Sequence, residues 1–243
     1  LVRRIKVAAA VPLLDALEAA TDADARGITE LLALVGPDVA HVAALRLPNA
    51  RWTVQRRILA ALARLETVPA DFSALQYAGH ADPEVRREAV RLLLRMPAHR
   101  DAVLSAALTD ADERVVRTAL GAAQGACPPL AVSIVMRKVE DESYSPDLRL
   151  QAIRVIGSLP SDDARDWLVR RTLARKQWLR RQRLAPRTPE LLAALAALAG
   201  RWREDDTVAP VLALAAASTD PDVQAAIRPA RASVAARPVE EPS

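Results

Sequence analysis

The sequence has few of the residues that form disulfides or aromatic cores. It contains one cysteine, Cys127, which excludes an internal disulfide and favours a reducing compartment such as the cytoplasm. Only 3% of its 243 residues are aromatic although 51% are hydrophobic, so alanine, leucine and valine must fill the core. We therefore expect a cytoplasmic protein whose elements pack closely through small and aliphatic side chains.

Catalytic and metal-binding motifs are also missing. The histidines His41, His80 and His99 are isolated, with no second histidine or cysteine at metal-ligand spacing. No phosphate-binding glycine loop and no G-x-S-x-G nucleophile motif occurs. Acidic pairs at 162–163 and 205–206 fall at predicted helix starts, where capping and the helix dipole account for them. The expectation is no enzyme, no cofactor and no metal.

No stretch approaches the roughly 20 apolar residues that a membrane span needs, because Asp15 and Glu18 interrupt the apolar run near the start. We expect no transmembrane segment. The sequence opens at Leu1 rather than at a methionine, which predicts a piece of a longer protein whose other part is not defined by this sequence.

Strong helix formers dominate and alternating β-branched and aromatic runs are absent, which predicts an all-α fold. A polar residue followed three positions later by an aliphatic one recurs at a period near thirty. The pairs are Asp82 and Val85, Asp112 and Val115, Ser145 and Leu148, Thr188 and Leu191, and Asp220 and Val223. Further aliphatic residues follow at offsets seven, ten and eleven, which is one face of a helix. This period predicts stacked helical repeats.

Start and stop signals agree with this period. The polar residues are suited to N-caps, and proline often follows them at the first helical position. A second set of prolines predicts the start of the other helix of each pair: Pro37, Pro69, Pro97, Pro129 and Pro160. Glycines near predicted helix ends are Gly36, Gly79, Gly125, Gly157 and Gly200. An irregular copy begins near Arg51, and its Trp52 is expected to pack at the helix entrance.

The segment Asp82-Pro-Glu-Val-Arg-Arg-Glu-Ala89 resembles the D-P-x-V-R-x-x-A helix of short bacterial, PBS-lyase-like HEAT repeats. The resemblance covers about residues 37–230, with residues 1–35 as a truncated first pair. It implies an α-solenoid, an armadillo/HEAT-like superhelix of six to seven antiparallel helix pairs, in a bacterial scaffold or adaptor. One repeat domain is expected over residues 1–231, followed by a disordered tail over 232–243.

One repeat is enlarged, at about 145–187. Ser145 and Thr188 are 43 positions apart, whereas the other repeats span 30 to 33. The excess lies in 166–183, which lacks glycine and proline and is predicted to be mostly helical. Nine basic residues and one acidic residue occur between 165 and 187, which favours an acidic partner surface. The candidate binding residues are Trp167, Arg170, Arg171, Arg175, Lys176, Trp178, Arg180, Arg181 and Arg183. The alternative is a solvated helix face with packed tryptophans.

A second candidate surface is a stripe of arginines at repeat offsets five, nine and thirteen. It contains Arg56, Arg64, Arg87, Arg91, Arg95, Arg117 and Arg154. If the second helices line the concave side, these residues predict a basic groove about four repeats long. Acidic neighbours such as Glu84, Glu88 and Glu113 would instead make it a neutralised, solvated face.

These features favour a non-enzymatic scaffold that binds another protein with an acidic surface. Nucleic acid remains a possible partner through the same arginines. An alkylpurine DNA glycosylase is the least favoured version, because no motif places an acidic residue beside the tryptophans. Peripheral binding to acidic lipid through the basic segment is a further alternative.

Overall fold

The computed structural model describes residues 2–36, 38–65, 68, 72–174 and 182–228. The chain divides into two compact units, unit 1 over residues 1–151 and unit 2 over residues 152–243. The all-α prediction is confirmed: within the described ranges, the extended structure amounts to an isolated antiparallel bridge between Leu173 and Leu184. The single domain over 1–231 and the disordered tail over 232–243 stay predictions.

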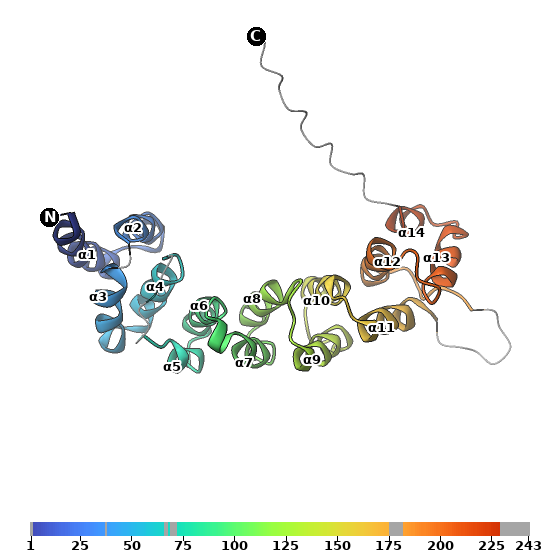
Figure 1. Cartoon of the computed structure of the whole chain (residues 1–243), viewed down its shortest axis with the longest axis horizontal. Coiled ribbons are helices and arrows are strands. Elements are labelled where there is room, and N and C mark those ends of the chain that lie inside the picture. Colours follow the sequence, from blue (N-terminus) through green and yellow to red (C-terminus); the bar gives the residue numbers. More distant parts are fainter. Residues whose placement is uncertain (1, 37, 66–67, 69–71, 175–181, 229–243) are drawn as a thin grey trace, which may run out of the picture. The chain divides into compact units, whose positions relative to one another are not determined.

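Unit 1 consists of helices stacked in two layers (Figure 1). Its elements are α1 (Val2–Ala19), α2 (Asp22–Val35), α3 (Asp38–Arg46), a 3-10 helix (Leu47–Asn49), α4 (Trp52–Leu62), α5 (Leu75–Ala78), α6 (Pro83–Leu93), α7 (Pro97–Ala107), α8 (Glu113–Ala123), α9 (Pro129–Glu140) and the start of α10 (Pro146–Ser158). The second helices α2, α4, α6 and α8 contact one another in succession. In the other layer α1 contacts α3, and α7 contacts α9.

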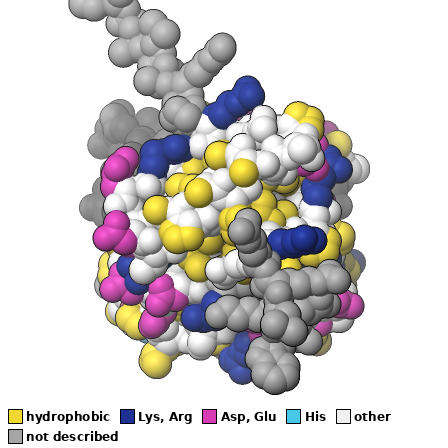
Figure 2. All heavy atoms as spheres, turned by 90° about the vertical axis from the view of Figure 1, so that its right-hand side faces the viewer, with side chains coloured by type: hydrophobic (Ala, Val, Ile, Leu, Met, Phe, Trp, Pro, Cys, Tyr) yellow, Lys and Arg dark blue, Asp and Glu magenta, His cyan; other side chains and the backbone are white. Residues whose placement is uncertain are grey.

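Unit 2 contains the end of α10, then α11 (Asp162–Thr172), α12 (Pro189–Arg201), α13 (Ala209–Ala216) and α14 (Pro221–Ala226). Helix α12 packs against α11, α13 and α14. Figure 2 shows apolar side chains gathered in the middle of this end of the chain, with charged side chains around them. Taken in chain order, the α-helices of the described residues make seven pairs, which agrees with the predicted six to seven repeats.

The predicted caps begin the second helices. The Asp82 carboxylate accepts hydrogen bonds from the backbone N–H groups of Glu84 and Val85, at 2.8 and 3.3 Å. Equivalent side-chain caps occur at Asp112, Thr188 and Asp220. These bonds satisfy N–H groups that a helix start leaves free. The repeated polar residue therefore sets where each of these helices begins.

Ser145 acts differently from the other repeated polar residues. Its hydroxyl donates to the Glu113 carboxylate at 2.7 Å, and its backbone N–H donates to the same group at 2.6 Å. Glu113 is the first residue of α8, one repeat earlier. The serine therefore links two repeats of unit 1.

The second proline register is confirmed at Pro97 and Pro129, which begin α7 and α9. It is wrong at Pro160, which lies before the N-cap Ser161 of α11 and outside the helix. Pro37 and Pro69 lie outside the described residues. The first described helix after Pro69 is α5, which has only four residues. This pair therefore has a much shorter first helix than its neighbours.

The enlarged repeat is helical as predicted only as far as Thr172, and residues 175–181 lie outside the described residues. Helix α11 ends at Thr172, and the next residues pair in antiparallel fashion. The Ala174 N–H donates to the carbonyl of Arg183 and the Ala185 N–H to the carbonyl of Thr172, both at 2.9 Å. The continuous helix therefore ends before this bridge.

Candidate binding groove

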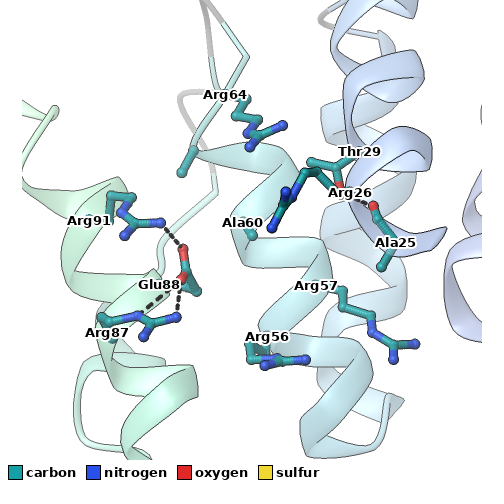
Figure 3. Close-up of a pocket in the computed structure, with 11 residues that line it drawn as sticks. Ala25, Arg26, Thr29, Arg56, Arg57, Ala60, Arg64, Arg87, Glu88 and Arg91 are labelled. Carbon is teal, nitrogen blue, oxygen red and sulfur yellow. Dashed lines mark hydrogen bonds and ion pairs between the residues drawn. The ribbon is translucent and has the colours of Figure 1, made fainter. Parts of the chain in front are cut away.

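Helices α2, α4 and α6 of unit 1 surround an open cavity of about 380 Å³ (Figure 3). We call it the arginine groove. Its lining residues are Ala25, Arg26, Thr29, Arg56, Arg57, Ala60, Ala63, Arg64, Arg87, Glu88 and Arg91. Six arginines and one carboxylate therefore border one space.

Small residues make the space between these arginines. Ala25 comes from α2, Ala60 from α4, and Ala63 directly follows α4. A methyl side chain leaves the helix backbone close to the cavity, while the neighbouring arginines extend around it. The groove can therefore admit a peptide-sized group between long cationic side chains.

On the α6 side, one buried carboxylate fixes two arginines. The Glu88 side chain is only 4% exposed. It accepts hydrogen bonds from the Arg87 guanidinium at 3.0 and 3.2 Å and from Arg91 at 2.8 Å. Figure 3 shows both guanidiniums directed at this carboxylate. Charge-assisted bonds of this kind hold the two cations in place while balancing only one of them.

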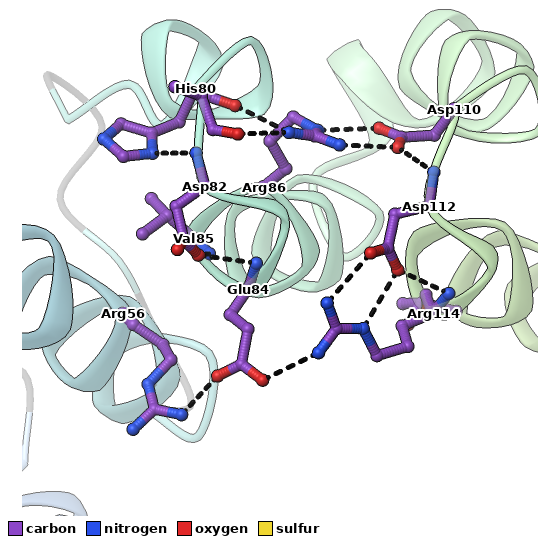
Figure 4. A network of polar contacts seen from close by, with 11 residues as sticks. Arg56, His80, Asp82, Glu84, Val85, Arg86, Asp110, Asp112 and Arg114 are labelled. Atoms are coloured by element: carbon purple, nitrogen blue, oxygen red, sulfur yellow. Dashed lines mark hydrogen bonds and ion pairs between the residues drawn. The ribbon is translucent and has the colours of Figure 1, made fainter.

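On α4, Arg56 belongs to a polar network that crosses three repeats (Figure 4). It forms an ion pair with Glu84 of α6, and Glu84 also accepts from Arg114 of α8 at 3.0 Å. Arg114 in turn pairs with Asp112 at 2.9 Å. Arg56 is thus held by neighbouring repeats as well as facing the groove.

The α2 side carries the least balanced charge. Arg26 is exposed and has no hydrogen bond or ion pair with any residue that the structure describes. Arg64 lies 3.6 Å from Glu30, and both side chains are about half exposed. Water screens such an exposed pair strongly. Even if Glu30 and Glu84 are counted with Glu88, the arginines outnumber the carboxylates six to three.

The predicted stripe is partly brought together. Arg56, Arg64, Arg87 and Arg91 line the groove. Arg117 stays on α8, 4.0 Å from Glu113, and Arg154 is an exposed residue of unit 2.

Arg95 corrects the stripe prediction. It donates to the backbone carbonyls of Ala63 and Leu65, the latter at 2.7 Å, because the end of α4 leaves carbonyls without helical partners. Arg95 therefore serves the fold and does not line the groove.

Two lining arginines were missed by the sequence pattern. Arg26 lies five residues after the N-cap Thr21, at the same offset as Arg56 and Arg87. Aligning α2 with the later repeats would have found it. Arg57 has no such signal, and its guanidinium also donates to the Leu17 carbonyl at 3.1 Å.

The basic segment of unit 2 is only partly described. Arg170, Arg171 and Arg183 are exposed and form no ion pair with other described residues. Trp167 is a correction, because its side chain is only 8% exposed and packs inside unit 2. The predicted residues Arg175, Lys176, Trp178, Arg180 and Arg181 lie outside the described residues.

Trp52 also differs from expectation. It begins α4, and 48% of its surface is exposed, so it does not pack fully at the helix entrance. The ring stands on the outside of the α4 start.

The carboxylates of the unit 1 network have shifted pKa values. Hydrogen bonds from the Arg114 guanidinium lower the pKa of Asp112 to about 2. Burial alone would raise the pKa of Asp110, but hydrogen bonds from Arg86 and from the Asp112 N–H outweigh it and lower this pKa. Both groups are therefore charged at neutral pH. Asp110 bonds directly to Arg86 of the preceding repeat, whereas Asp112 holds Arg114, which reaches Glu84 of that repeat.

Acid is predicted to destabilise unit 1 through this network. Because the folded pKa of Asp112 lies below its ordinary 3.8, its contribution is full above about pH 4 and is lost as the pH falls through about 2. Solvent screening reduces the expected loss to about 1 kcal/mol. Thermal melting between pH 6 and 2 measures it. The Arg114→Ala variant should show a shallower decrease, and an identical decrease would contradict this account.

Within the described residues, no group of three or more histidine, cysteine, aspartate or glutamate side chains could hold a metal ion. The described helices likewise include none that is both long enough and apolar enough to cross a membrane.

Comparison with known proteins supports the fold. No family model and no curated protein matches the sequence. The structure of YibA from Escherichia coli aligns with a TM-score of 0.60 and 15% identity over 87% of this chain and 78% of YibA. An engineered protein aligns with a TM-score of 0.50 and 20% identity over 88% of this chain and 65% of its own. A designed armadillo repeat protein reaches a TM-score of 0.48 and 16% identity, covering 77% and 96%.

YibA is itself a HEAT-like repeat protein, and at these identities the likeness concerns the fold. Together with the stacked helices within each unit, it confirms the predicted architecture. The chain therefore has the fold of a HEAT/armadillo-like α-solenoid.

Proposed function

We propose that this chain is a non-enzymatic scaffold whose arginine groove holds an acidic segment of a partner protein. The observation that supports it most is the charge balance of the groove, where six arginines face one lining carboxylate. Solenoid repeats are an architecture suited to extended binding surfaces. The half-buried, unpaired Cys127 is consistent with a cytoplasmic setting.

Charge complementarity selects the partner. A carboxylate placed above Ala60 would meet Arg26 and Arg64, whose charges are the least balanced in the groove. Planar guanidiniums can bind a carboxylate through two parallel hydrogen bonds. Glu88 already holds Arg87 and Arg91 in place. These two arginines would therefore strengthen the positive potential of the groove without losing side-chain freedom on binding.

Arg170, Arg171 and Arg183 of unit 2 are proposed as a second contact surface for the same class of acidic partner. They lie at either side of the antiparallel bridge that closes the enlarged repeat. Nucleic acid and acidic lipid present similar charge, so both belong among the test ligands.

The test is direct binding of a labelled peptide of about twelve residues in which glutamate alternates with serine, long enough when extended to cross three helices. Wild type should bind it, and Arg26→Glu with Arg64→Glu should weaken binding at least about tenfold. The control, Arg137→Glu with Arg228→Glu, makes the same change in net charge at exposed residues outside the groove. It should bind like wild type.

Single-stranded DNA and vesicles with anionic headgroups are measured in parallel at the same salt concentration. Weaker binding to both than to the peptide supports the proposal. Equal losses in the two double variants, no peptide binding, or tighter binding to DNA or vesicles than to the peptide would overturn it.

A further inference from the structure

Trp52 is an exposed aromatic residue on the same face of α4 as the arginine groove. Trp52, Arg56 and Ala60 are spaced four residues apart, so they lie along one face of the helix. Arg56 and Ala60 line the groove. The ring therefore stands at one end of a row that leads into the groove.

This position is unusual among the repeats. The residue directly after the N-cap is Pro83, Pro146, Pro189 or Pro221 in four other second helices, where proline suits the first turn. Tryptophan offers no such benefit at a helix start. The residue thus departs from the repeat pattern at the helix that forms the middle of the groove.

The exposure of Trp52 leaves much of its apolar surface in contact with solvent. A tryptophan can bury 150–250 Å² when fully packed, whereas 48% of this side chain is exposed. Among the described residues, no arginine or lysine is stacked on its ring, although such stacking occurs at Trp202 and Tyr144. Tryptophan and arginine are enriched among the residues that dominate binding energy at interfaces, where the partner buries them.

From these observations we propose that Trp52 is the apolar anchor of the groove, so that the partner segment carries a bulky apolar residue near its acidic residues. This inference rests on the function proposed above and specifies its ligand. Trp52 and Ala60 are eight residues apart, about 12 Å along the helix axis. An extended peptide covers that distance in about four residues. The favoured ligand has an apolar side chain about four positions from its first glutamate.

Two peptides of equal length and charge test the inference. The anchored peptide has leucine four positions before a glutamate pair, and the plain peptide has serine there. Both are titrated against wild type, Trp52→Ala and Leu130→Ala. Leu130 is a matched control, because it is an 85% exposed side chain of α9 that does not line the groove.

Wild type and Leu130→Ala should bind the anchored peptide at least about tenfold more tightly than the plain one. Trp52→Ala should bind the two peptides equally, and Trp52→Phe should restore part of the preference. Unchanged helicity and melting establish that Trp52→Ala is folded.

A preference that persists in Trp52→Ala, or that is absent in wild type, would overturn the inference. The proposed function would still stand if the plain peptide depends on Arg26 and Arg64. If neither peptide binds wild type, both the inference and the proposed function fail.

Discussion

Replacing Gly157 with alanine is expected to destabilise unit 2 by about 1–3 kcal/mol. Gly157 lies in α10, where an added Cβ would overlap the Ala197 Cβ of α12. A Cβ has no rotamer that avoids this contact, so the helices would have to separate. The intrinsic gain of alanine over glycine in a helix, about 1 kcal/mol, offsets only part of this cost.

Gly200→Ala is the matched control. Gly200 also lies in a helix of unit 2, and a Cβ there would meet nothing within 4 Å. This change should leave stability unaltered or raise it by up to about 1 kcal/mol. Urea unfolding followed by tryptophan fluorescence compares the two variants. Equal stability changes of the same sign in the two variants would contradict the prediction. They would mean that contact with α12 does not restrict the side chain at position 157.

Removing the Asp110 carboxylate is expected to destabilise unit 1 by about 2–4 kcal/mol. Asp110 and Arg86 form two parallel hydrogen bonds, at 2.7 and 2.8 Å, and their side chains are 12% and 16% exposed. Asp110 also accepts from the Asp112 N–H at 2.8 Å (Figure 4). In Asp110→Ala, the largely buried Arg86 guanidinium loses its counter-charge. The turn before α8 also loses the hydrogen bond from the Asp112 N–H.

Asp101→Ala is the control for this prediction. Asp101 pairs with Arg100 at 3.3 Å but is 71% exposed, so its removal should change stability by less than about 0.5 kcal/mol. Both variants are compared by urea unfolding at pH 7. Similar small effects in the two would mean that burial does not strengthen the Arg86 pair.

The repeat architecture could be predicted because its signals are local. An N-cap such as Asp82 and the proline after it act within one helical turn, and the aliphatic residues follow the same helix. The apolar stripe is buried as predicted, for example at Val85 and Ala89. The predictions were wrong where a contact between residues far apart in the sequence outweighed a local preference. Pairing of Leu173 with Leu184 ended a helix that composition alone favoured.

The roles of the arginines could be predicted only in part, because one residue type serves two purposes. Arg95, Arg100 and Arg201 donate to carbonyls at the ends of helices, and these carbonyls belong to residues 22 to 43 positions away. Such contacts depend on how repeats stack, which spacing within one helix does not reveal. The sequence-based prediction therefore assigned too many arginines to a binding surface. The exposure of Trp52 was hidden for the same reason, whereas the burial of Trp167 agrees with the alternative of packed tryptophans.

The central claim is that an acidic partner segment lies in the arginine groove, and site-specific crosslinking tests it most directly. A photoreactive residue at position 60, on the groove-lining face of α4, is compared with one at position 133, an exposed site on α9. With the glutamate peptide, the account predicts crosslinks from position 60 that disappear in Arg26→Glu with Arg64→Glu, and few from position 133. Equal crosslinking at both positions, or crosslinks that survive the charge reversal, would contradict it.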